Sequence, residues 1–161
     1  LYSSAASDVY KRQINNVLFD QETDEAVCVI DLDTVMPGLS LYDFGDLVRT
    51  ATNPAAEDER DLTKVRLRAR VFESLVEGYL ASAGRVLTNE EVSQMAFSGR
   101  LISLELGIRF LTDHLNGDEY FRVNREGQNL DRARTQLCLA EQIAESEEEM
   151  KRYVFKVARA R

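Results

Sequence analysis

Two aspartates that follow an apolar strand are the residues of this chain best suited to chemistry. Residues 29–33 read Val-Ile-Asp-Leu-Asp, and Met-Pro-Gly follows at 36–38. Asp31 and Asp33 share one face if the strand geometry persists, because side chains alternate with a period of two. Carboxylate oxygens suit Mg²⁺, which takes one or two protein carboxylates alongside waters and substrate phosphates. Asn16, upstream, offers an amide oxygen that could complete such a metal site.

Two short β-rich runs place these polar residues at the ends of strands. Residues 17–19 and 26–30 are apolar and largely β-favouring, and the polar segment 20–25 separates them. This pattern predicts a β-hairpin. Purely structural roles remain open, with Asn16 as a turn residue at the start of the hairpin and Asp31 as a strand-end cap.

The rest of the chain has helical periodicity. Apolar residues recur at three- and four-residue steps over 62–80, which predicts a helix that ends at Gly84. Thr88 and Glu91 form a capping-box pattern that begins a second long helix, to about 116–117. A loop over 118–129, a helix over 130–144 and a last helix capped at Ser146 complete the prediction. The expected fold class is α+β, with a β-hairpin packed on a mainly helical body in one domain.

Composition limits the classes of protein that this chain can represent. The 161 residues are 44% hydrophobic and 30% charged, with a formal net charge of −8. An acidic chain argues against a nucleic-acid partner. No apolar run approaches the roughly 20 residues of a membrane-spanning helix, so we expect no membrane association and a cytoplasmic location. Cys28 and Cys138 are predicted to be small core residues in a reducing compartment.

The first thirteen residues differ in character from the sequence that follows them. Residues 3–13 read Ser-Ser-Ala-Ala-Ser-Asp-Val-Tyr-Lys-Arg-Gln and resemble the translation of a sequencing adapter. We therefore expect residues 1–13 to be an adapter-derived artefact and the natural sequence to occupy 14–161. The alternative is a native polar tail of the kind found at many termini.

The hairpin and the helix after it carry a family resemblance. Asn16, the Ile-Asp-Leu turn at 30–32 and Tyr-Asp-Phe-Gly-Asp at 42–46 together resemble the C-terminal lobe of the aminoglycoside phosphotransferase and choline kinase superfamily, which is protein-kinase-like. Residues 14–20 and 29–38 are most similar to the N-acetylhexosamine 1-kinases, and the similarity extends to at least Leu137. This resemblance implies transfer of the γ-phosphate of ATP, with Mg²⁺, to the anomeric hydroxyl of N-acetylglucosamine or N-acetylgalactosamine.

The same resemblance implies roles for residues of the predicted hairpin and the helix after it. Asn16 and Asp31 would hold the metal ions that bridge the nucleotide phosphates. Asp33 would bind sugar hydroxyls, with a second metal contact as the competing interpretation. Asp43 would brace the backbone of the catalytic loop.

Two residues further along the chain are implied to contact the sugar. They are Arg109, which offers a fork of donors, and Tyr120, which offers a hydroxyl and a ring face. The alternatives are a surface ion-pair arginine and a half-buried packing tyrosine.

The catalytic base of the superfamily has no counterpart in this chain. By resemblance it is an aspartate about five residues before Asn16, where the adapter-like segment stands. The N-terminal lobe that covers the nucleotide has no counterpart either, so we expect this chain to be inactive and its parent to be the kinase. Two rival hypotheses stay open: an aminoglycoside- or choline-type small-molecule kinase, and a non-catalytic helical binding module. The exact sugar and the oligomeric state are not predicted.

Overall fold

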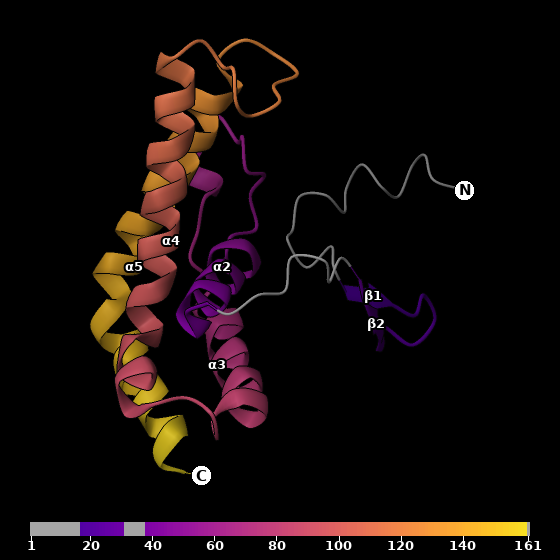
Figure 1. Cartoon of the computed structure of the whole chain (residues 1–161), viewed down its shortest axis with the longest axis vertical. Coiled ribbons are helices and arrows are strands. Elements are labelled where there is room, and N and C mark those ends of the chain that lie inside the picture. The colour runs from indigo at the N-terminus through magenta and orange to yellow at the C-terminus, as the bar shows by residue number, and fades with distance from the viewer. Residues whose placement is uncertain (1–16, 31–37, 161) are drawn as a thin grey trace.

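The computed structural model describes residues 17–30 and 38–160, which form a β-hairpin followed by a helical body (Figure 1). The elements in chain order are β1 (Val17–Phe19), β2 (Ala26–Val29), α2 (Ser40–Thr52), the 3₁₀ helix η3 (Leu62–Lys64), α3 (Ala69–Ala83), α4 (Asn89–Leu115) and α5 (Gln128–Arg159). The predicted α+β class, a hairpin with a mainly helical body, is confirmed.

The hairpin is antiparallel and closes through an aspartate-centred turn. Val17 pairs with Val29 at its open end, and a bulge interrupts the register between Leu18 and Phe19. The Asp20 carboxylate accepts the backbone N–H groups of residues 22 and 23, each at 2.9 Å. The described hairpin side chains stay outside the helical core, and Val27 is 64% exposed.

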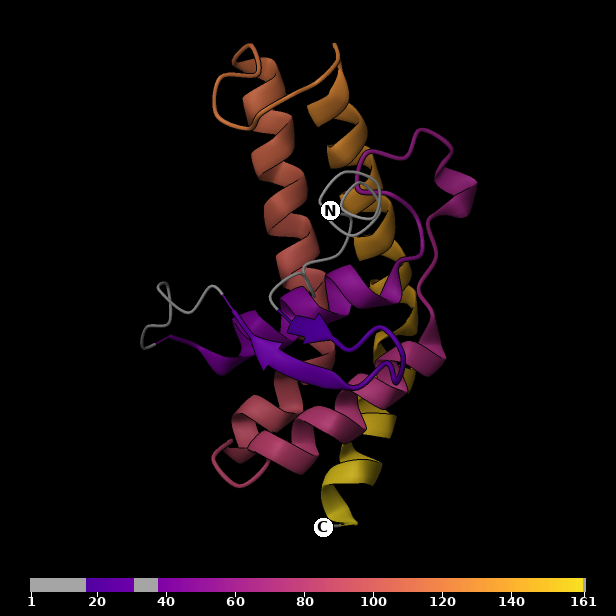
Figure 2. The ribbon, with the colours of Figure 1, turned by 90° about the vertical axis from the view of Figure 1, so that its right-hand side faces the viewer.

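Two long helices form the spine of the body. α4 and α5 run side by side along the long axis, while α2 and α3 lie on one side of them (Figures 1 and 2). The core fills the space between these helices. Its buried members are Phe44, Val48, Val65, Phe72, Val76, Leu80, Met95, Ala96, Leu139, Ile143, Met150 and Val154. Phe44 also packs its ring against Phe72 and Tyr79, so two aromatic contacts join α2 to α3.

Glycines allow α2 and α4 to approach closely. An added Cβ at Gly45 would lie 2.6 Å from the backbone oxygen of Ser98, and one at Gly99 would lie 2.5 Å from Val48 Cγ1. No ordinary side chain tolerates such distances without a shift of the backbone. The α2–α4 contact therefore depends on these two residues having no side chain.

The helix predicted over 62–80 begins later than the periodicity suggested. Residues 65–68 are not helical, because they are hydrogen-bonded to other parts of the body. The N–H of Leu67 donates to Gln142 Oε1 at 3.0 Å, and Gln142 Nε2 donates to the carbonyl of Val65 at 2.9 Å. α3 consequently starts at Ala69, and it ends before Gly84 as predicted.

The two C-terminal helices of the prediction are one continuous helix, and the capping box proposed at Ser146 is wrong. The buried residues Leu139, Ile143, Met150 and Val154 keep helical spacing across that position, and neither Gly nor Pro interrupts α5. Glu147 pairs instead with Arg100 of α4. A polar Ser-Glu-Glu-Glu run is compatible with a helix interior when one face stays buried.

The cysteines differ from the predicted pair of core residues. Cys28 is exposed in the hairpin and Cys138 is partly buried against the core, and no disulfide joins them. Over the described parts of the chain, no helix combines the length and apolar character required to cross a membrane.

The glycine contact gives a matched pair of substitutions. Gly45→Ala should lower the free energy of unfolding by about 1–3 kcal/mol, because its Cβ meets a backbone carbonyl that cannot yield. Gly78→Ala should instead raise it by about 0.5–1 kcal/mol, because Gly78 lies inside α3 with open space around it. Urea unfolding of the two variants measures both. Equal effects of the two substitutions would contradict the proposed close contact.

Candidate functional site

Three of the residues with a predicted role are neighbours of the hairpin in the sequence. Asn16, Asp31 and Asp33 are outside the described residues. The described neighbours are Val17, directly after Asn16, and Val29, two residues before Asp31. These two residues pair at the open end of the hairpin. Within 17–30 and 38–160, no three His, Cys, Asp or Glu side chains form a group that could hold a metal ion.

The start of α2 is tied firmly to the helical body. The Ser40 hydroxyl donates to Glu91 Oε1 at 2.7 Å, and the Tyr79 hydroxyl donates to the Ser40 carbonyl at 3.1 Å. Glu91 also completes the predicted capping box, since its other oxygen accepts the Thr88 N–H at 2.7 Å. Sequence reasoning identified this capping box but not its connection to Ser40. The first residue of α2 is thus anchored to both α3 and α4.

These contacts shift the pKa values of Glu91 and Tyr79. The Ser40 hydroxyl, and then the backbone and side chain of Thr88, lower the pKa of Glu91. Burial, and then the negative charges of Asp43 and Glu91, raise the pKa of Tyr79. Asp43 itself is exposed in the first turn of α2, where a carboxylate is favourable to the helix dipole. Its bracing role remains a prediction.

Arg109 and Tyr120 come together at the far end of α4. The Arg109 guanidinium carbon lies 5.8 Å from the centre of the Tyr120 ring and 5.4 Å from that of Phe121. Both predicted residues line a hollow of about 370 Å³, together with Ile108, Thr112, Asp113, Asn116 and Phe121. We call this the Arg109–Tyr120 hollow. Arg109 also lies 3.9 Å from Glu105, so it takes part in a surface ion pair as well, which is the alternative role that the sequence leaves open for it.

Sequence reasoning missed the residues that shape this hollow. Asp113, only 5% exposed, accepts the backbone N–H groups of Tyr120 at 2.8 Å and of Phe121 at 2.9 Å. Asn129 is fully buried and donates to both Asp113 and Asp118. Burial alone would raise the pKa of Asp113, but the N–H donors of Phe121, Tyr120 and Glu119 outweigh it and lower the pKa. The sequence signal that could have found them is a polar residue on the buried face of a helix, Asp113 in α4 and Asn129 in α5.

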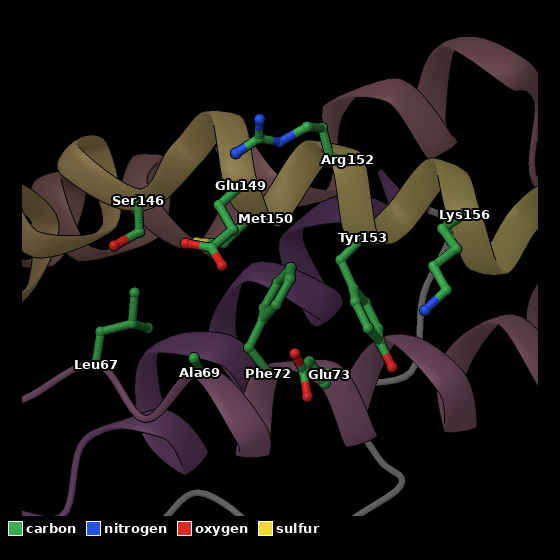
Figure 3. Close-up of a pocket in the computed structure, with 10 residues that line it drawn as sticks. All are labelled: Leu67, Ala69, Phe72, Glu73, Ser146, Glu149, Met150, Arg152, Tyr153 and Lys156. Carbon is green, nitrogen blue, oxygen red and sulfur yellow. The ribbon is translucent and has the colours of Figure 1, made fainter.

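A second cavity, of about 360 Å³, lies between α3 and α5 (Figure 3). Phe72 and Met150 form its apolar wall, and the Glu73 and Glu149 carboxylates come from opposite helices. None of the residues that the sequence singled out for chemistry lines this cavity.

A comparison with known protein families gives a match in the N-terminal half of the chain. Residues 13–90 match the model of the phosphotransferase enzyme family, APH. This segment contains the hairpin, the acidic motif, α2, α3 and the first two residues of α4. Over these residues the chain is similar to kinase-like phosphotransferases, which generally use ATP and Mg²⁺. Arg109 and Tyr120 lie beyond the matched residues.

The Ser40–Glu91 contact predicts a specific pH dependence. Because folding lowers the pKa of Glu91, its carboxylate stabilises the protein above the ordinary glutamate pKa, and this stability is lost as the pH falls through the lower folded-state pKa. Glu91→Gln should therefore lower the melting temperature at neutral pH, and the difference from the wild type should shrink in acid. Glu90→Gln, one residue away in the first turn of α4, is the matched control. A Glu91→Gln deficit that is the same at every pH would contradict this assignment.

Proposed function

We propose that this chain is the C-terminal lobe of an ATP-dependent sugar kinase that phosphorylates the anomeric hydroxyl of an N-acetylhexosamine. The family match over residues 13–90 supports phosphoryl transfer. The observation that carries the sugar assignment is the meeting of Arg109 and Tyr120 at one hollow. The resemblance in the sequence implies sugar contact for the same two residues.

In this proposal the N-terminal residues bind the metal and the nucleotide, and residues of both regions bind the sugar. Asn16 and Asp31 would hold Mg²⁺, because amide and carboxylate oxygens are the donors that this ion prefers. Bound Mg²⁺ would neutralise negative charge on the nucleotide phosphates, while protein groups position the reactants. Asp33 would bind sugar hydroxyls, and Asp43 would brace the catalytic loop. The catalytic base would belong to the parent protein, upstream of the residues that match the family.

The chemistry of the hollow favours a neutral sugar over a cationic acceptor. Arg109 contributes a positive charge to the lining of the hollow, which would repel choline or an aminoglycoside amine. The nearest buried carboxylate, Asp113, is already engaged by two backbone N–H groups and the Asn129 amide. The Tyr120 ring is 74% exposed and offers a flat apolar surface for the C–H face of a pyranose. A hydroxyl-rich, uncharged ring matches these groups best.

Sugar binding to the 161-residue chain tests the proposal without needing catalysis. N-acetylglucosamine and N-acetylgalactosamine should show saturation-transfer NMR signals, with choline as the competing ligand. Tyr120→Ala and Arg109→Ala should each weaken binding about tenfold, equivalent to about 1.4 kcal/mol. Tyr120→Phe keeps the ring and separates its contribution from that of the hydroxyl. Arg85→Ala removes an exposed arginine before α4 and serves as the control.

Each rival hypothesis has its own outcome in these measurements. Binding of choline but not of either sugar would contradict the sugar-kinase proposal and support an amino-alcohol kinase. A non-catalytic binding module would bind no ATP in the presence of Mg²⁺, even when the upstream lobe is supplied. The chain alone should produce no sugar phosphate from ATP, and product above background would contradict the assignment of the catalytic base to the parent.

A further inference from the structure

Tyr120 combines an exposed ring with a firmly held backbone. Its side chain is 74% exposed, and it lies in the loop between α4 and α5 (Figure 1). An exposed aromatic residue on a free loop would have to be ordered when a ligand binds, which lowers affinity. The contacts beneath this loop remove that cost.

A single buried carboxylate holds the loop from below. Asp113 lies in the last turn of α4, and its two oxygens accept the N–H groups of Tyr120 and Phe121, at 2.8 and 2.9 Å. Hydrogen bonds from N–H donors to an ionised carboxylate are stronger than those between neutral groups. The backbone on both sides of the Tyr120 Cα is therefore fixed to α4.

Asn129 links this carboxylate to the start of α5. Its Nδ2 donates to Asp113 Oδ2 at 2.8 Å and to Asp118 Oδ1 at 2.9 Å. Its Oδ1 accepts a hydrogen bond from Arg132 Nη1 at 2.8 Å, and the same Nη1 donates to the carbonyl of Arg122 at 3.2 Å. Every hydrogen-bonding atom of this fully buried amide is directed at the loop or at its supports.

Ring contacts and backbone geometry complete the support. Phe121 packs against Phe110 of α4, with ring centres 4.7 Å apart, so the residue after Tyr120 is also held by an apolar contact. The loop leaves α4 through Gly117 and Asp118, whose φ angles are +97° and +61°. A left-handed conformation at Gly117 is readily adopted only by glycine. The loop thus has one well-defined path away from the helix.

We propose that Asp113 and Asn129 are positioning residues that hold Tyr120 against Arg109 and so preform the Arg109–Tyr120 hollow. The use of that hollow for the acceptor sugar rests on the proposed function. The positioning itself rests only on the hydrogen bonds described above. In this arrangement neither Asp113 nor Asn129 needs to touch the sugar.

Asp113→Asn is the most direct test, because it keeps the size of the side chain. One carboxylate oxygen becomes an NH₂ group, which cannot accept from Tyr120 if it replaces Oδ1, or from Phe121 and Asn129 if it replaces Oδ2. Amide hydrogen exchange at Tyr120 and Phe121 should then increase at least tenfold, while amides in the middle of α4 and α5 stay protected. Nuclear Overhauser contacts between the Tyr120 ring and the Arg109 side chain should be lost, and the Kd for the sugar should rise about tenfold.

A second variant guards against general destabilisation by a buried substitution. Gly117→Ala adds one methyl group in open space, yet it strains the left-handed backbone on which the loop depends. It should weaken the Tyr120–Arg109 contact without touching the buried network. Arg100→Gln, which breaks an α4–α5 ion pair with Glu147 at 3.4 Å, is the control for altered helix packing. This control should change neither the ring contact nor the sugar affinity.

The outcomes separate this inference from the proposed function. Unchanged exchange at Tyr120 and an unchanged contact with Arg109 in Asp113→Asn would overturn the positioning role. Loosening of the loop with unaltered sugar affinity would also overturn it, since Asp113 would then be only structural. If the wild type binds neither sugar, the proposed function fails. In that case, loss of the Tyr120–Arg109 contact in Asp113→Asn, with the contact kept in Arg100→Gln, would still support the positioning role.

Discussion

The close approach of α2 to α4 is the contact on which the rest of the structure depends. Gly45 lies against the backbone of Ser98 in α4, and Gly99 lies against Val48 of α2, so the two helices approach closely. This approach brings Ser40 to Glu91 and places Phe44 among the aromatic residues of α3. The acidic segment after β2 is therefore followed by a helix whose position is fixed at both its first turn and its centre.

α4 connects the start of α2 with the Arg109–Tyr120 hollow. The first turn of α4 supplies Glu91, which accepts the hydrogen bond from the Ser40 hydroxyl. The last turn of α4 supplies Asp113, and Arg109 stands one turn before it. A helix of 27 residues spans about 40 Å, so one continuous element links the start of α2 to the Arg109–Tyr120 hollow. Displacement of α4 would therefore disturb both the Ser40–Glu91 contact and this hollow.

The two polar regions of the fold are stabilised in opposite ways. The loop around Tyr120 is held by buried, mutually satisfied groups, which is the condition under which buried polar networks specify one conformation. The hairpin has an ordered aspartate turn, but its apolar side chains are largely exposed. The family match includes the hairpin, whereas the loop lies beyond it.

The sequence alone determined the elements whose signals are local. A β-rich pair around a polar turn specified the hairpin, the Thr88–Glu91 spacing specified the start of α4, and Gly84 specified the end of α3. The resemblance named Arg109 and Tyr120, which the structure brings together at one hollow, and their contact with a sugar stays a prediction. Tertiary structure decided the rest. Residues 65–68 are not helical, because Gln142 forms hydrogen bonds with their backbone. α5 is one continuous helix, because its buried residues keep helical spacing across Ser146. Asp113 and Asn129 acquired their positions because the end of α4 meets the start of α5, a contact between residues that no local pattern encodes.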